Sequence, residues 1–190
     1  WLPLTQWTLA EFKTAFPIET LAICHNLNIC GTWGDPIMNR DIDKIVKYII
    51  ENSNCEIVID TNGSIRDEQW WWELGMTSGK RLTVVFAVDG IDQQMHEKYR
   101  RFTDLQKVLT NMQSLAETKA KIIATTIQFK HNQDYTKEIK QMVIDNGATS
   151  YRIVQSDRFN SGTNSFKFTD EYGSPDSLER ATVDPPNAII

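Results

Sequence analysis

Apolar positions alternate along the chain between helical spacing and short continuous runs. The clearest helical stripe recurs at i, i+3, i+4, i+7 and i+8, over Ile42, Ile45, Val46, Ile49 and Ile50. Similar spacing predicts helices over residues 7–15, 64–75, 103–115 and 135–147. Apolar runs predict strands over residues 20–24 or 27–30 (or one bent strand made from both), and over 56–59, 82–88, 121–129 and 151–154.

The predicted order is a helix, four strand-helix units and a last strand. Strict alternation with buried strands predicts an α/β fold with a parallel sheet and right-handed crossovers, either open or rolled into a barrel. From Asp157 onward the periodicity disappears and polar, Gly-containing and Pro-containing segments take over. Residues 160–190 are therefore predicted to be a linker or a poorly ordered C-terminal extension.

Composition narrows the class of protein. The chain has 190 residues, is 41% hydrophobic and carries a net charge of -5, which argues against a general binder of nucleic acid or membrane surfaces. The basic cluster Lys98–Arg101 is short and is interpreted as a solvated helix face. The sequence contains neither an apolar run of about 20 residues nor a signal peptide, and its three cysteines do not suggest a disulfide framework. A cytoplasmic location is predicted.

Three successive predicted strands end in acids and glycines: Gly34-Asp35, Asp60 to Gly63, and Asp89-Gly90. The carboxyl ends of parallel strands open onto one face, and ligands bind there. Any one of these endings is explained by the preference of Asp and Gly for turns. Three in a row favour a binding site at that face.

Other candidate groups have simpler interpretations. Cys24, His25 and Cys30 lack a fourth metal ligand and the C-x-x-C spacing, so the cysteines are predicted to be small buried residues, and Cys55 to be structural. His96 and His131 fall in polar stretches and are predicted to be solvated, with His131 close enough to a strand end to reach the rim. The run Trp70–Trp72 is predicted to pack a helix onto the sheet.

Read together, the strand endings resemble a known family. Cys30-Gly31-Thr32-Trp33-Gly34-Asp35-Pro36 resembles the Gly-Gly-Glu-Pro motif that ends the second strand of radical S-adenosylmethionine (radical SAM) enzymes. Asp60-Thr61-Asn62-Gly63-Ser64 resembles their third-strand Thr-Asn-Gly ending, and Phe86–Gly90 resembles their fourth-strand signature. The resemblance covers residues 1–159 and implies a partial (β/α)6 TIM-like barrel, truncated at its N-terminus.

The resemblance also implies a binding site for S-adenosylmethionine. Backbone groups near the first strand ending would hold the amino group of its methionine moiety, the next two endings would meet its carboxylate or ribose, and apolar residues would pack its adenine. The residues implied for the amino group are Gly31, Thr32, Trp33, Gly34 and Asp35. Those implied for the carboxylate or ribose are Thr61, Asn62, Ala87 and Asp89, and those implied for the adenine are Ile127 and Ile153.

One departure from the family pattern is large, because the C-x3-C-x2-C loop that holds a 4Fe-4S cluster is missing from these residues. The resemblance therefore implies a fragment whose cluster loop precedes Trp1 and which is inactive alone. The parent would form a 5′-deoxyadenosyl radical with electrons from flavodoxin or ferredoxin. Its substrate stays open between a peptide, a nucleotide and a small metabolite.

Two alternatives to the radical enzyme remain. The carboxylates of Asp35, Asp60 and Asp89 could hold a divalent metal ion in a barrel hydrolase or lyase, because hard cations prefer oxygen ligands. Alternatively, the barrel could be a binding module without catalytic activity.

Overall fold

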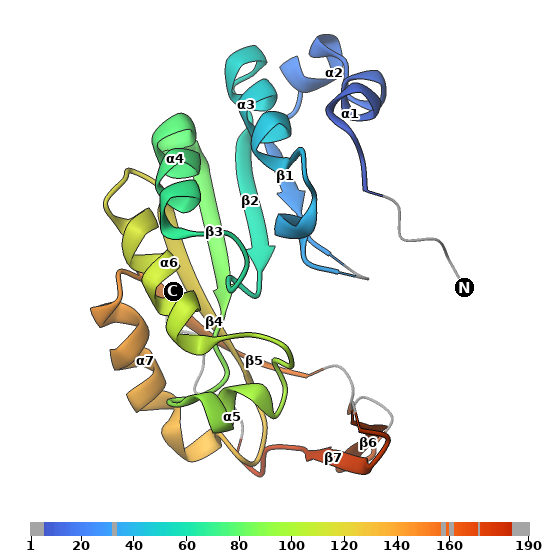
Figure 1. The fold of residues 1–190 in the computed structure, drawn as a ribbon, viewed down its shortest axis with the longest axis vertical. Helices are drawn as coiled ribbons and strands as arrows, with labels where there is room; N and C mark the ends of the chain where they lie inside the picture. The colour runs from blue at the N-terminus through green and yellow to red at the C-terminus, as the bar shows by residue number, and fades with distance from the viewer. Residues whose placement is uncertain (1–5, 32–33, 157–158, 160–161, 171, 184–190) are drawn as a thin grey trace.

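Five parallel strands form one sheet in the order β1-β2-β3-β4-β5, and helices alternate with them (Figure 1). The computed structural model describes residues 6–31, 34–156, 159, 162–170 and 172–183. The strands are β1 (Asn26–Ile29), β2 (Glu56–Thr61), β3 (Leu82–Ala87), β4 (Lys121–Gln128) and β5 (Ser150–Gln155). The helices are α1 (Leu9–Ala15), α2 (Ile18–Ala22), α3 (Ile42–Asn52), α4 (Glu68–Ser78), α5 (Gln93–Glu97), α6 (Leu105–Ala116) and α7 (Thr136–Asp145). The predicted α/β class is confirmed.

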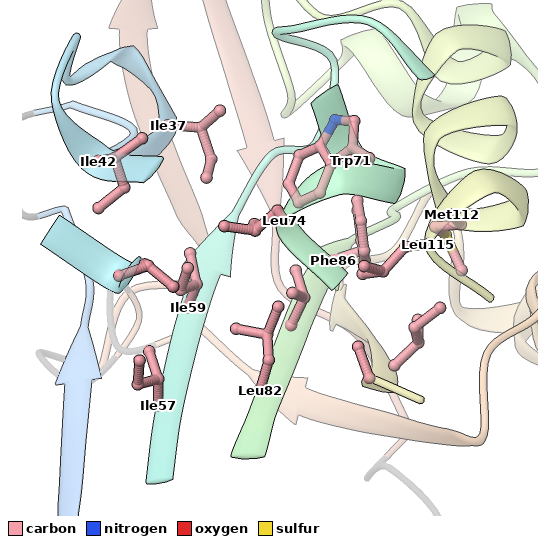
Figure 2. Packing of buried hydrophobic residues seen from close by; sticks show 14 of the residues in the cluster. Ile37, Ile42, Ile57, Ile59, Trp71, Leu74, Leu82, Phe86, Met112 and Leu115 are labelled. Carbon is pink, nitrogen blue, oxygen red and sulfur yellow. The ribbon is translucent and has the colours of Figure 1, made fainter. Parts of the chain in front are cut away.

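Alternate strand residues face the helices and build the core. In β2 and β3 the fully buried positions are Ile57, Ile59, Leu82, Val84 and Phe86. Figure 2 shows Trp71 and Leu74 of α4 beside these strand residues, with Met112 and Leu115 of α6 close by. The interpretation of the tryptophan run as helix-to-sheet packing holds for Trp71, which is completely buried.

The other strand residues point away from helices α3, α4, α6 and α7. Register pairs them in rows across the sheet, because partners in parallel strands share a face. We call this the inner face, and it consists of Val58, Asp60, Thr83, Val85, Ala87, Ile123, Thr125, Ile127, Arg152 and Val154, with Glu56 and Lys121 at its amino-terminal edge.

Several predicted boundaries are wrong, each for a local reason. Of the alternatives for the first strand, residues 27–30 are confirmed, since β1 covers Asn26–Ile29. Residues 18–22 form the short helix α2, because Pro17 starts a helical turn that buries Leu21. Helix α4 begins after Asp67, whose carboxylate accepts the Trp70 N–H at 2.9 Å, and runs through Gly75 to a positive-φ stop at Gly79.

Helix α6 is capped by Asp104, whose carboxylate accepts the Lys107 N–H at 3.1 Å. Helix α1 is capped by a reciprocal capping box between Thr8 and Glu11.

The end of the chain differs from the predicted linker. Strands β6 (Ser165–Thr169) and β7 (Pro175–Glu179) form an antiparallel hairpin. The Lys130 N–H donates to the Glu179 carbonyl at 3.0 Å, so the hairpin is attached to the chain just after β4. Leu178 of β7 packs with Phe129 and Phe159 in a small second hydrophobic core. The sequence pattern missed these residues because the apolar positions that hold the hairpin are few and widely spaced.

Within the part of the chain that the structure describes, no helix has the length and apolar character needed to cross a bilayer.

Candidate functional site at the carboxyl rim

The turn after β1 is fastened to the end of β2 through Asp35. Its carboxylate accepts the Thr61 hydroxyl at 2.9 Å and the Asn62 N–H at 2.7 Å, and it also caps the short 3-10 turn Pro36–Met38 through the Ile37 N–H. Gly31 and Gly34 approach each other closely, since a Cβ on Gly31 would lie 1.5 Å from the Gly34 carbonyl oxygen. Glycine is required at position 31, and bare backbone is left at the end of β1.

The same chain of contacts continues across the next two strands. Asn62 Oδ1 accepts from Arg100 Nη1 at 3.0 Å, and Arg100 Nε donates to Asp89 Oδ2 at 2.5 Å. Asp89 Oδ1 in turn accepts the Ile127 N–H at 2.6 Å. We call these linked residues (Asp35, Thr61, Asn62, Arg100, Asp89 and the Ile127 amide) the rim network, and it joins the carboxyl ends of β1 to β4.

Asn132 completes the attachment of β4. Its amide nitrogen donates to the carbonyls of Asp89 and Ile127, both at 3.0 Å, while its oxygen accepts the Phe129 N–H at 2.8 Å. This side chain is fully buried with three partners, as a buried polar group should be. The rim is therefore rigid on the side of β3 and β4.

Asp89 is a buried charge with a dedicated partner. Its side chain is 0% exposed, and burial raises the pKa of its carboxyl group, while the Arg100 charge and the Ile127 N–H oppose that rise. Because both oxygens are occupied, this carboxylate positions the rim and does not face a ligand. The basic cluster that was interpreted as a solvated helix face thus contains, in Arg100, a mostly buried member.

The prediction that His96 and His131 are solvated is wrong. His96 is fully buried, and its Nδ1 accepts the Asp89 N–H at 3.2 Å, which places the ring proton on Nε2. Burial, aided by the Arg100 charge, lowers the pKa of His96 to about 4. His131 is half-buried against the Phe129 ring, and burial and Lys98 lower its pKa to about 4 as well.

His96 should make the protein less stable in mild acid. The pKa is lowered on folding from 6.5 to about 4, so the stabilisation is present above pH 6.5 and is lost as pH falls toward 4. Between pH 7 and pH 5 we expect a loss of about 1–2 kcal/mol from this residue. Urea unfolding of the wild type and His96→Asn at both pH values measures it, and equal pH dependence of the two proteins would contradict the assignment.

The three cysteines do not converge. Cys24 and Cys55 lie near the amino ends of β1 and β2 with their sulfur atoms 3.5 Å apart, whereas Cys30 follows β1 and is exposed. The prediction of a structural role therefore fits Cys55, which is buried, and the prediction of burial is wrong for Cys30. Among the described residues, no group of three or more His, Cys, Asp or Glu side chains is placed to hold a metal ion.

The divalent-metal alternative does not agree with this geometry. Asp35 and Asp89 are each engaged in the rim network, and Asp60 points onto the inner face. The three carboxylates serve separate roles instead of sharing one site.

The remaining predicted site residues fall on different faces. Ala87 and Ile127 lie on the inner face near the rim, where Val154 is the register partner of Ile127. Ile153 shares the opposite, helix-facing side with Tyr151, which packs against the main core. Alternation along β5 could have identified Val154 as the inner residue. Thr32 and Trp33 lie outside the described residues.

A cavity of about 520 Å³ lies elsewhere, among the start of α5, the first turns of α6 and the helix α7. Its lining includes Asp92, Gln93, Asp104 and Met142, and no residue of the rim network. It is open and lies on the helical side of the sheet, so it does not coincide with the carboxyl rim.

The comparisons with known proteins agree on the fold. No protein-family model matches the sequence, and no curated protein matches it. Among solved structures, SuiB from Streptococcus suis bound to its precursor peptide SuiA is similar over 72% of this chain and 30% of its own, with a TM-score of 0.60 and 16% identity. The anSMEcpe structure with bound AdoMet and Kp18Cys peptide is similar over 81% of this chain and 44% of its own, with a TM-score of 0.59 and 12% identity.

Both of these proteins are radical SAM enzymes. The fold of this chain is that of their partial TIM-like barrel. The chain spans less than half the length of either protein. At 12% and 16% identity, the likeness concerns the fold, and the chemistry has to be argued from the rim.

Proposed function

We propose that the carboxyl rim binds S-adenosylmethionine and that the chain is part of a radical SAM enzyme. The observation that carries this proposal is the Asp35 carboxylate, which joins the segment after β1 to Thr61 and Asn62 at the carboxyl end of β2. Similar solved structures support it, because anSMEcpe and SuiB have each been solved with bound S-adenosylmethionine.

The rim offers the groups that this cofactor needs. Backbone carbonyls of the turn between Gly31 and Asp35 would accept from the methionine ammonium group, and Asn62 Nδ2 would donate to the carboxylate. Ala87 leaves room on the inner face for the ribose, and Ile127 with Val154 would pack against adenine. Asp89 acts through Arg100 and the Ile127 amide, and we assign it a positioning role.

The residues of this chain do not fit a 4Fe-4S cluster. Only Cys30 lies near the rim, and Cys24 and Cys55 lie near the other end of the sheet. S-adenosylmethionine, when reduced by such a cluster, supplies a 5′-deoxyadenosyl radical that abstracts hydrogen. In the proposed parent enzyme the cluster ligands come from outside these residues, and flavodoxin or ferredoxin supplies the electron. A binding module without catalysis is the second candidate, because the rim can hold the cofactor with or without cluster ligands.

Binding of the cofactor to this chain tests the first step. Isothermal titration should show one S-adenosylmethionine per chain, and Asp35→Ala should weaken binding at least about tenfold. The reason is that the change removes the acceptor that holds Thr61 and the Asn62 N–H, and a bond to a charged group contributes about 1.5–3 kcal/mol.

Asp67→Ala is the matched control, since it removes the same charge from a helix cap outside the rim network. Undisturbed binding in Asp67→Ala with weakened binding in Asp35→Ala supports the proposal. The proposal is contradicted if the wild type gives no heat of binding, or if the wild type and both variants bind S-adenosylmethionine with equal affinity. A parent chain that binds the cofactor but forms no 5′-deoxyadenosine with iron, sulfide and a reductant would favour the binding module.

A further inference from the structure

Two opposite charges on the inner face have no partner of their own. Asp60 is half-buried in β2 and Arg152 is exposed in β5, and within the described residues neither makes a hydrogen bond or an ion pair. This distinguishes Asp60 from Asp35 and Asp89, whose carboxylates are occupied by the rim network.

The two charges lie across the inner face from each other. Asp60 pairs in register with Val85, and Val85 with Ile123, while Arg152 pairs with Thr125, and Thr125 with Ala87. Three strand spacings of about 4.8 Å separate β2 from β5 along a flat sheet, and curvature shortens the path across it. Burial raises the pKa of Asp60, and the Arg152 charge opposes that rise, so the two groups influence each other without forming a pair.

A half-buried carboxylate without a hydrogen-bond donor is unfavourable, and a ligand that supplies the donor removes that penalty. A guanidinium group opposite it presents a planar fork that suits a carboxylate. Between the charged groups the face is made of small or apolar side chains, among them Val85, Ala87 and Ile123. This surface can accept an extended backbone that carries one charge of each sign.

We propose that Asp60 and Arg152 select a peptide with a basic and an acidic side chain on the same side of an extended segment. In an extended peptide, residues two apart share a side, so the simplest match is Lys-X-Glu or Arg-X-Asp. The basic group contacts Asp60 and the acidic group contacts Arg152. SuiB and anSMEcpe have been solved with bound peptides, which favours this class of ligand over a nucleotide. The inference rests on the proposed function, since it takes the inner face beside the cofactor rim as the substrate side.

Four fluorescein-labelled peptides of equal length test the inference, with Lys-Gly-Glu, Lys-Gly-Ala, Ala-Gly-Glu or Ala-Gly-Ala at the centre. Fluorescence anisotropy is measured on the full chain, with and without saturating S-adenosylmethionine. We expect the wild type to bind the Lys-Gly-Glu peptide at least about tenfold more tightly than the Ala-Gly-Ala peptide.

Variants then assign each preference to one residue. Asp60→Asn should remove the preference for Lys and keep that for Glu, and Arg152→Gln should do the reverse. Glu56→Gln and Lys121→Gln are matched controls, because they make the same changes in charge at the exposed amino-terminal edge of the same face. Both should bind all four peptides as the wild type does.

The outcomes separate the two proposals. Equal affinity for the four peptides, or equal effects of the inner-face variants and their controls, overturns the charge-selection inference. Absence of S-adenosylmethionine binding in the parallel titration overturns the proposed function instead. A preference for Lys-Gly-Glu that follows Asp60 and Arg152 supports the inference.

Discussion

Replacement of Arg100 by methionine is expected to destabilise the protein by about 3–5 kcal/mol, the usual effect of removing one partner of a buried ion pair. Methionine keeps most of the side-chain volume but leaves the Asp89 carboxylate at 0% exposure without its charged partner. Two bonds of the rim network are lost together, those to Asp89 and to Asn62. Urea unfolding at pH 7 measures the change.

Lys130→Met is the matched control for this substitution. Lys130 pairs with Glu179 at 2.6 Å, but both side chains are more than half exposed. An exposed pair contributes about 0–1 kcal/mol, so the control should be nearly as stable as the wild type. Similar losses in the two variants would mean that the Arg100–Asp89 contact does not act as a buried pair.

Trp71→Ala is expected to destabilise the protein by about 3–5 kcal/mol, because it opens a large cavity in the core. The Trp71 ring is fully buried, lies 5.0 Å from the Phe86 ring between centroids, and donates its indole N–H to the Ile65 carbonyl at 3.2 Å. Figure 2 shows it between α4 and the strands of the core.

Trp72→Ala makes the same substitution at the next position of α4 and is compared with Trp71→Ala. Trp72 is only half-buried, and a substitution there should change the free energy of unfolding by about 1 kcal/mol or less. Thermal or urea unfolding of the two variants measures which of them loses more stability. A larger loss in Trp72→Ala than in Trp71→Ala would contradict the assignment of Trp71 to the core.

The regular part of the fold could be predicted from the sequence because its signals are local. The stripe over α3 and the continuous apolar run over β3 indicate helix and strand directly. Alternation of such elements restricts the sheet to a parallel arrangement. The hairpin β6–β7 could not be predicted this way, since its Phe166, Phe168 and Leu178 act through contacts with residues far away in sequence.

The site was predicted at the level of the strand endings but not of individual roles. The positions of Asp35, Thr61 and Asn62 at or just after the ends of their strands place them at the rim, where the structure has them. The sequence indicates only that Arg100 belongs to a short basic cluster. Its contact with Asp89 depends on the fold, which brings these two residues together. The Asp60–Arg152 relation depends on register across four strands, which no local pattern encodes.

The central claim is that S-adenosylmethionine binds at the carboxyl rim. Hydrogen–deuterium exchange with and without this ligand tests it most directly. The account predicts slower exchange at the amides after β1 and β2, including Gly34 and Asn62, with unchanged exchange around the cavity lined by Asp92, Gln93 and Met142. Slower exchange at that cavity, with no change at the rim, would contradict the account.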